Sequence, residues 1–115
     1  MKRFLQRLWR QPPRDKTIDI VAQDQQGNIV LGLVDLTGWG SIEKNIQLQE
    51  RINLCMQFLD SGELHKEYPD AQGKQVTIRL YLSEQPDAEG KLFLAAVSEQ
   101  IKSFDVGFEC EKYEG

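Results

Sequence analysis

The sequence predicts a two-layer α/β (α+β) sandwich, with two helices on one face of a mixed sheet of about four strands. Three observations favour this fold class. Several short segments alternate apolar and polar residues, as half-buried strands do, and two longer segments repeat apolar residues at helical spacing. The segments follow one another in the order β-β-α-β-α-β, and a helix between two strands predicts that those strands are parallel.

The chain of 115 residues is expected to form one domain over residues 17–115, preceded by a basic N-terminal arm over residues 1–16. Its 40% apolar and 28% charged residues are typical of soluble globular proteins. No apolar stretch approaches the roughly 18 residues that a membrane span needs. Arginines interrupt the start of the chain, so it does not resemble a secretory signal. We therefore expect a cytoplasmic protein without a membrane span.

The first two strands are predicted to form a hairpin. Residues 17–24 alternate in character, whereas residues 28–36 are more continuously apolar. Between them, Gly27 and Asn28 favour a turn because both residue types tolerate a positive φ.

The clearest helix is predicted over residues 41–62. Ser41 is expected to be the N-cap, Glu43 favours the positive end of the helix dipole, and Gly62 supplies a stop. One face repeats apolar residues at helical spacing and is expected to be buried. It consists of Leu48, Ile52, Cys55, Met56 and Leu59.

The second half of the chain predicts a strand at 75–83, a helix at 86–104 and a last strand at 106–113. The helical stripe is formed by Phe93, Val97, Ile101 and Phe104. Both strands alternate strictly, which indicates one covered sheet face and one exposed face, so both helices should lie on the same side. The side chains expected to point inward from the last strand are Val106, Phe108 and Cys110.

The charge is distributed unevenly. The arm holds six basic residues and one acid, whereas residues 17–115 hold 8 basic and 17 acidic residues, a net charge of −9. Such a body repels nucleic-acid phosphates. We therefore expect no nucleic-acid partner, and the acidic surface favours a basic protein partner.

A glycine-rich turn, "DLTGWGS", precedes the first helix and raises the question of phosphate binding. A dinucleotide fingerprint needs a third glycine at position 43, where Glu43 stands, and the Lys-Ser/Thr of a P-loop is missing. We interpret the segment as a strand-to-helix turn. Trp39 then either packs under the helix or projects toward a ligand or partner.

No catalytic, metal or cofactor site is predicted. His65 is the only histidine, in a polar segment between helix and strand, and a zinc site needs three or four ligands. Cys55 and Cys110 are not in a CxxC spacing and both fall in apolar patterns. They are expected to be buried thiols rather than nucleophiles, in a reducing compartment.

Exposed side chains offer the better candidates for a binding site. The outer sheet face should present Arg79, Tyr81, Glu109 and Glu111, which with Trp39 are the candidate partner-binding residues. The alternative is a solvated face with cross-strand ion pairs.

Leu54 and Phe58 lie four residues apart and off the main helical stripe. Two alternatives are open for them. They pack against the apolar residues of the arm, or they form the contact of a homodimer.

Three short motifs stand in order along the chain: "FLDSG" (58–62), "YPDAQGK" (68–74) and "PDAEG" (86–90). Together with a tryptophan ahead of the first helix, here Trp39, they resemble the signatures of a small uncharacterised bacterial family known as a domain of unknown function. The resemblance covers residues 17 to about 112. It implies a compact αβ domain with no established activity or cofactor.

Three hypotheses about function follow. The first is a non-enzymatic acidic protein-binding module, of which an immunity-type inhibitor of a bacterial toxin is one concrete version. The second is a small-ligand binder or enzyme that uses the Trp39 turn, at the strand ends where open α/β sheets place ligands. The third is a structural subunit tethered by its basic arm.

Overall fold

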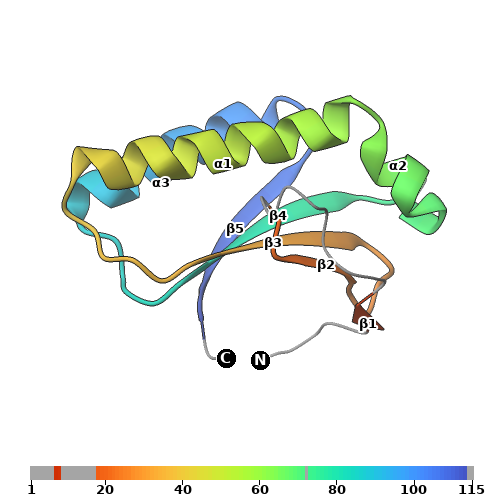
Figure 1. The fold of residues 1–115 in the computed structure, drawn as a ribbon, viewed down its shortest axis with the longest axis horizontal. Helices are drawn as coiled ribbons and strands as arrows, with labels where there is room; N and C mark the ends of the chain where they lie inside the picture. The colour runs from red at the N-terminus through yellow and green to blue at the C-terminus, as the bar shows by residue number, and fades with distance from the viewer. Residues whose placement is uncertain (1–6, 9–17, 72, 114–115) are drawn as a thin grey trace.

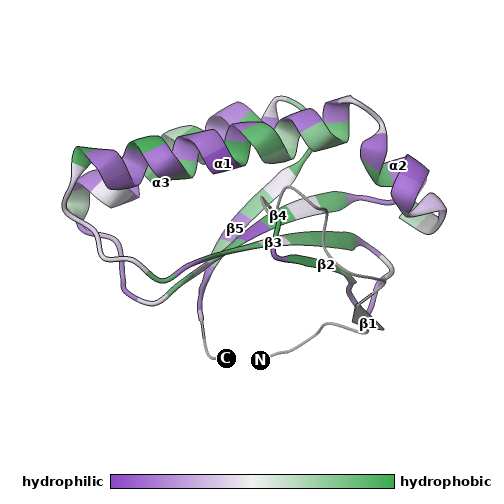
Figure 2. Cartoon of the chain, in the orientation of Figure 1, coloured by the Kyte–Doolittle hydropathy of each residue, from purple (hydrophilic) through white to green (hydrophobic). Residues whose placement is uncertain are grey.

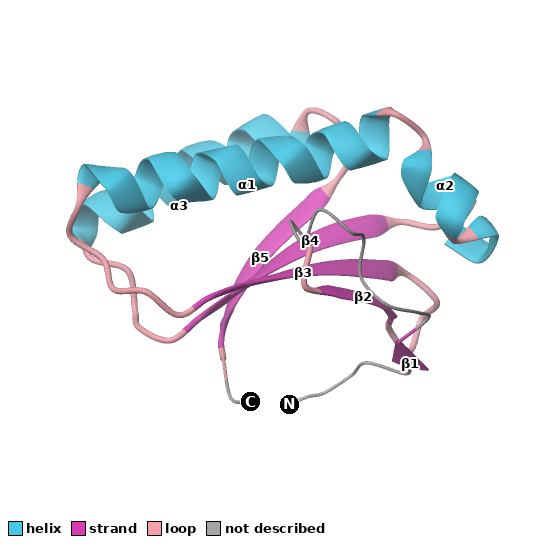
Figure 3. Ribbon diagram, viewed as in Figure 1, coloured by secondary structure: helices cyan, strands magenta, loops and turns pink. Residues whose placement is uncertain are grey.

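The computed structural model describes residues 7–8, 18–71 and 73–113. Its strands form one sheet in the order β1-β2-β3-β4-β5. The two long helices lie together on one face of this sheet (Figure 1, Figure 3). The predicted two-layer sandwich is confirmed, and the hydrophobic core fills the space between the layers.

The order of the main elements is also confirmed, with two additions, a short strand near the start and a short helix after the first long one. The elements are β1 (Arg7–Leu8), β2 (Ile20–Gln23), β3 (Ile29–Asp35), α1 (Ile42–Asp60), α2 (Glu63–Glu67), a 3₁₀ turn (Pro69–Ala71), β4 (Val76–Leu82), α3 (Ala88–Lys102) and β5 (Gly107–Lys112).

The strand pairing follows from the connections. Strands β2 and β3 form the predicted antiparallel hairpin, and β3, β4 and β5 are parallel neighbours joined through helices. The register aligns Gly32, Arg79 and Glu109 in one row across the three parallel strands. This row lies on the outer face, which is the sheet face turned away from α1 and α3.

Strand β1 belongs to the arm. Its two residues pair antiparallel with β2, with Arg7 opposite Gln23 and Leu8 opposite Ala22. This pairing joins one piece of the arm to the sheet. Phe4, Leu5 and Trp9, further apolar residues of the arm against which Leu54 and Phe58 were expected to pack, lie outside the described residues.

The hairpin turn is fixed by one side chain. The Asp24 carboxylate accepts hydrogen bonds from the backbone N–H groups of Gln26 and Asn28, both at 2.9 Å. Gly27 has a φ of 88°, as the predicted turn requires.

Helix α1 begins and ends as predicted. The Ser41 Oγ accepts a hydrogen bond from the Lys44 N–H at 3.1 Å. Beyond the helix end, Gly62 has a φ of 85°, in the left-handed region. In the predicted stripe Leu48, Ile52 and Cys55 are buried, and Met56 and Leu59 are partly buried against the core.

The position predicted for Phe58 is wrong. Its side chain is 5% exposed and belongs to the core, because position 58 falls three residues after Cys55 on the buried side of the helix. Phe58 is therefore not available for the homodimer contact proposed from the sequence. Leu54, with 44% of its surface exposed, does lie on the outside of α1.

The segment after α1, expected to be a polar loop, contains helix α2 and a 3₁₀ turn instead. Leu64, Tyr68 and Ala71 are buried there, and these apolar side chains anchor the segment against the core. His65 lies on the exposed side of α2.

Helix α3 starts at the N-cap Asp87, whose carboxylate accepts the Gly90 N–H at 2.8 Å. Its buried face consists of Leu94, Val97 and Ile101, with Phe93 partly buried beside them. Phe104, predicted to continue this stripe, is 64% exposed because the helix ends at Lys102.

The outer face is only partly exposed. Hydropathy is apolar along most of β3, which ends at the charged Asp35, and mixed along β5 (Figure 2). On the outer face Ala22 and Val30 are almost fully buried, whereas Glu109 and Glu111 on β5 are exposed. The prediction of an exposed outer face therefore holds at β5 and is wrong over β2 and β3. A strand that is apolar over most of its length, as β3 is, is typical of burial on both faces.

Candidate functional site

Two loops at the carboxyl ends of β3 and β4 lie against each other (Figure 1). The Trp39 Nε1–H donates to the Glu84 carbonyl oxygen at 3.2 Å, and the Ser83 hydroxyl donates to the Leu36 carbonyl oxygen at 3.1 Å. The loop before α1 and the loop before α3 therefore form one continuous surface at this end of the sheet.

Trp39 packs against the start of α3 and is only partly buried. A Cβ atom at Gly90 would lie 2.6 Å from Cε3 of the tryptophan ring, so only glycine fits beneath it. Trp39 was expected either to pack under the first helix or to project outward. It does pack, but against α3 instead of α1, and part of the ring remains accessible.

A buried lysine supports the same turn and was not predicted. Lys44 is 4% exposed, and its ammonium donates to the carbonyl oxygens of Thr37 at 2.7 Å and Gly38 at 3.3 Å. The ammonium also lies 3.6 Å from a carboxylate oxygen of Asp35 and 4.2 Å from the centroid of the Trp39 ring. These groups enclose the charge, so Lys44 holds the turn in shape.

The carboxylate of Asp35 is ionised at neutral pH. Burial acts to raise the pKa of Asp35, but hydrogen bonds from the Thr37 hydroxyl and N–H, with the charges of Lys44 and Arg51, outweigh burial and lower it. The Thr37 hydroxyl donates at 2.6 Å and the Thr37 N–H at 3.0 Å. Only one feature of the sequence indicated this pair: Lys44 lies four residues before Leu48, on the buried side of α1.

The outer face brings together the four residues predicted there. The Arg79 guanidinium donates to the Glu109 carboxylate, lies 3.6 Å from a carboxylate oxygen of Glu111, and contacts the Tyr81 hydroxyl at 3.4 Å. Arg79 is only 8% exposed, which corrects the expectation that it faces water. Burial acts to lower the pKa of Arg79, but Tyr81 and Glu109 outweigh burial and raise it. Arg79 is thus a fixed cation within the cluster.

Two exposed carboxylates share this one guanidinium. The side chains of Glu109 and Glu111 are 43% and 44% exposed, so the cluster keeps a net negative charge at the surface. Tyr81 lies beside them over β3, where a Cβ at Gly32 would lie 3.2 Å from its ring. Gly32 thereby gives the tyrosine ring room on the outer face.

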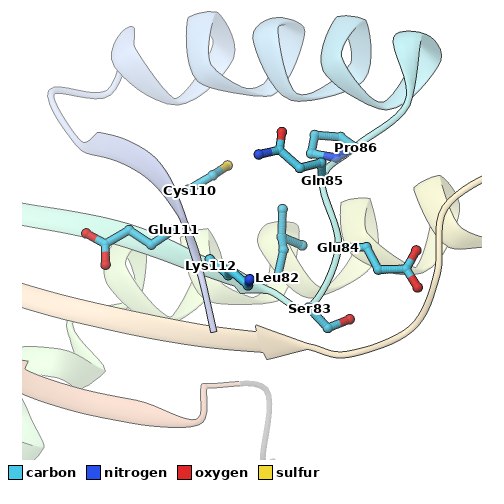
Figure 4. Close-up of a pocket in the computed structure, with 8 residues that line it drawn as sticks. All are labelled: Leu82, Ser83, Glu84, Gln85, Pro86, Cys110, Glu111 and Lys112. Atoms are coloured by element: carbon cyan, nitrogen blue, oxygen red, sulfur yellow. The ribbon is translucent and has the colours of Figure 1, made fainter. Parts of the chain in front are cut away.

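An open pocket of about 470 Å³ lies at the carboxyl ends of β4 and β5. Its lining consists of Leu82, Ser83, Glu84, Gln85, Pro86, Cys110, Glu111 and Lys112 (Figure 4). The Cys110 side chain points to the same side of β5 as α3, toward Gln85 and Pro86, whereas Glu111 points away from it (Figure 4).

Cys110 is exposed, which corrects the prediction of a buried thiol; Cys55 is buried as predicted. Strand β5 is the last strand of the described sheet, and within the described residues no further strand covers its far side. Although the residue is exposed as a whole, partial burial of the thiol, helped by Glu109, raises the pKa of Cys110 to about 11. A protonated thiol at neutral pH is a poor nucleophile.

The described part of the chain contains no group of three or more histidine, cysteine, aspartate or glutamate side chains that could hold a metal ion. None of its helices combines the length and apolar character needed to cross a membrane. His65 and the carboxylates near it therefore do not form a ligand cluster.

A family of unknown function, DUF6572, matches residues 13–114. The chain belongs to this family. The match confirms the resemblance to a domain of unknown function. It includes the Trp39 turn and the outer-face residues Arg79, Tyr81, Glu109 and Glu111. Comparisons with curated proteins and with solved structures gave no match.

Proposed function

We propose that this DUF6572 chain is a non-enzymatic module that binds a basic segment of a partner protein. The observation that supports this most directly is the pair Glu109 and Glu111, which is exposed on the last strand of the sheet and has one guanidinium between two carboxylates. Such a pair has capacity for a second cation, which a lysine or arginine of a partner would supply.

The charge of the whole body supports the same proposal. Residues 17–115 contain 17 acidic and 8 basic residues. Three of those cations, Lys44, Arg51 and Arg79, form ion pairs within the fold. The net charge is −9 for residues 17–115 and −4 for the whole chain, so the long-range field is negative and would speed the approach of a basic partner.

The state of the reactive groups supports a function without catalysis. The Cys110 thiol, with a pKa of about 11, stays protonated at neutral pH. The ammonium of Lys44 is enclosed by the turn that it holds. Neither group is poised to act on a substrate.

One concrete version of this function is an immunity-type inhibitor, which would cover a basic surface of a toxin domain. Such an inhibitor needs a rigid acidic surface and no catalytic group. Neither Cys55 nor Cys110 forms a disulfide, which is compatible with the cytoplasm as the place of action.

A second candidate function is the binding of a small ligand in the pocket at the ends of β4 and β5. Its place favours this, because ligands of open α/β sheets bind beyond the carboxyl ends of the strands. Leu82 supplies an apolar wall, and Gln85 and Lys112 supply polar groups. A fragment screen by NMR, with shifts confined to the pocket lining, would support this alternative.

The protein-binding proposal is tested by association kinetics with a partner captured by the full chain. Replacing Glu109 and Glu111 with glutamine should slow association about three- to tenfold at low salt, because exposed charges steer encounter and are screened beyond about 8 Å at physiological salt. The matched control replaces two exposed acids of α1, Glu43 and Glu50, with glutamine. If both double variants slow association equally, the field acts without a local site.

Tyr81 provides the complementary measurement. Tyr81→Ala should mainly speed dissociation, at a loss of about 2 kcal/mol in binding free energy, if the ring is a central contact. The proposal is wrong if neither the Glu109/Glu111 variant nor Tyr81→Ala changes either rate constant.

A further inference from the structure

Strand β5 forms one edge of the sheet. Among the described residues it pairs with β4 alone, whereas β4 is paired on both sides. Glu109 through Lys112 are all exposed. An edge strand presents a row of backbone groups that another strand can pair with.

The hydrogen bonding shows which backbone groups face outward. The Tyr113 N–H donates to the Leu82 carbonyl oxygen on β4 at 2.8 Å. Backbone groups alternate in direction along a strand, so the N–H groups of Glu111 and Glu109 also point toward β4. The N–H and C=O groups of Phe108, Cys110 and Lys112 therefore point to the open edge. Among the described residues no backbone group pairs with them, so another strand could form a ladder along this edge.

We propose that the basic partner segment binds as an added antiparallel strand along the open edge of β5. This inference rests on the proposed function and specifies how the partner is held. In that arrangement Phe108, Cys110 and Lys112 exchange hydrogen bonds with the partner. Glu109 and Glu111 then occupy the non-hydrogen-bonded positions, where opposing side chains approach most closely.

The two faces of β5 define the chemistry of the partner strand. Partner residues opposite Glu109 and Glu111 lie on the outer face, where lysine or arginine complements the two exposed carboxylates. The partner residue opposite Cys110 lies on the helix side, next to the pocket between β5 and the start of α3. An apolar side chain there would enter the pocket. The recognised segment thus alternates basic and apolar residues.

The same charges argue against a second copy of this chain as the occupant. Antiparallel pairing of two β5 strands would bring Glu109 and Glu111 of both copies onto one face, within the reach of cross-strand pairs. Like charges in such positions destabilise the pairing. We therefore expect the edge to select a basic strand and to resist self-association.

The test uses the full chain and a short capped peptide in which valine and lysine alternate. NMR titration should show saturable binding, with amide exchange at Phe108, Cys110 and Lys112 slowed about tenfold or more in the complex. A peptide with glutamate in place of lysine should not bind. A peptide N-methylated at the alternate amides that would face β5 should bind at least about tenfold more weakly, because it loses several of the cross-strand hydrogen bonds.

A backbone variant of the chain tests the same edge. Cys110→Pro removes an N–H that points away from β4, so the sheet should remain intact, as a heteronuclear NMR spectrum would verify. It should weaken peptide binding about tenfold or more, whereas the matched variant Cys110→Ala should bind like the wild type.

The outcomes separate this inference from the function on which it rests. Absence of binding at roughly millimolar lysine peptide would overturn strand addition. Equal binding of the N-methylated peptide, with shifts away from β5, would also overturn it. Either result leaves the proposed function intact if a captured basic protein still depends on Glu109 and Glu111 for its association rate. If that dependence is missing as well, both proposals fail.

Discussion

Replacing Gly90 with alanine tests how Trp39 is seated on α3. The added Cβ would lie 2.6 and 2.8 Å from two ring carbons of Trp39 and 3.0 Å from Cβ of Pro86. Atoms at such distances must move apart, and overpacking of this kind destabilises a protein by about 1–3 kcal/mol. Alanine in place of glycine stabilises a helix by about 1 kcal/mol when nothing obstructs it. The net expectation is a loss of about 1 kcal/mol.

A second substitution isolates the contact. In a Trp39→Ala background both of the closest contacts are removed, and the next nearest atom to the new Cβ is Cβ of Pro86, at 3.0 Å. Gly90→Ala should then be neutral or stabilising by up to about 1 kcal/mol, from helix propensity. The double-mutant cycle should give a coupling of about 1–2 kcal/mol between positions 39 and 90.

The assay is urea unfolding followed by far-UV circular dichroism, since the variants change the tryptophan fluorescence. A destabilisation of 1 kcal/mol should also lower the melting temperature by about 4 °C in a domain of this size. If Gly90→Ala is more stable than the wild type while Trp39 is present, the ring does not lie against α3 and the described turn is wrong.

Three further predictions concern single groups. Lys44→Met should lower the free energy of unfolding in urea by about 3 kcal/mol, because it leaves the nearly buried Asp35 carboxylate without the Lys44 ammonium. Adding Asp35→Leu should recover part of the loss, and full stability of Lys44→Met would contradict the pairing. The folded-state pKa of Asp35 lies below its ordinary value of 3.8, so the stabilisation from its ionised form is complete above about pH 5 and is lost as the pH falls through the folded pKa. Asp35→Asn should therefore flatten the dependence of the unfolding free energy on pH below about pH 5. An unchanged slope of that dependence would count against the lowered pKa. In a Cys55→Ala background, Cys110 should be alkylated by iodoacetamide at pH 7 about a hundredfold more slowly than a thiol with a pKa of 9.0. The alkylation rate should rise about tenfold per pH unit toward about pH 10. A rate at about pH 7 equal to that of a free cysteine would refute the raised pKa.

The features that the sequence predicts well depend on neighbouring residues in the chain. Ser41 and Gly62 bound α1 because N-caps and left-handed glycines act within one turn of the helix. The parallel pairing of β3, β4 and β5 follows from the alternation of strands and helices. The placement of Glu109 and Glu111 on the outer face follows from the two-residue period of a strand.

The features that were missed depend on the position of an element in the whole fold. Cys110 alternates like an inward residue, but its strand is at the edge of the sheet, where fewer elements cover it. Arg79 alternates like an exposed residue, but Tyr81 and Glu109 close over its guanidinium. Period-two patterns identify a face and do not tell how well that face is covered.

The hydrogen bond of Trp39 has a consequence for how this chain can change in evolution. Its acceptor is the backbone oxygen of Glu84, so the side chain at position 84 is free to vary in charge without disturbing the bond. The pocket rim can therefore acquire a new preference while the turn keeps its shape. Positions 39 and 90 have no such freedom, because the indole ring occupies the space that any side chain at 90 would need. Among related chains, a residue larger than glycine at 90 should be accompanied by a smaller residue than tryptophan at 39.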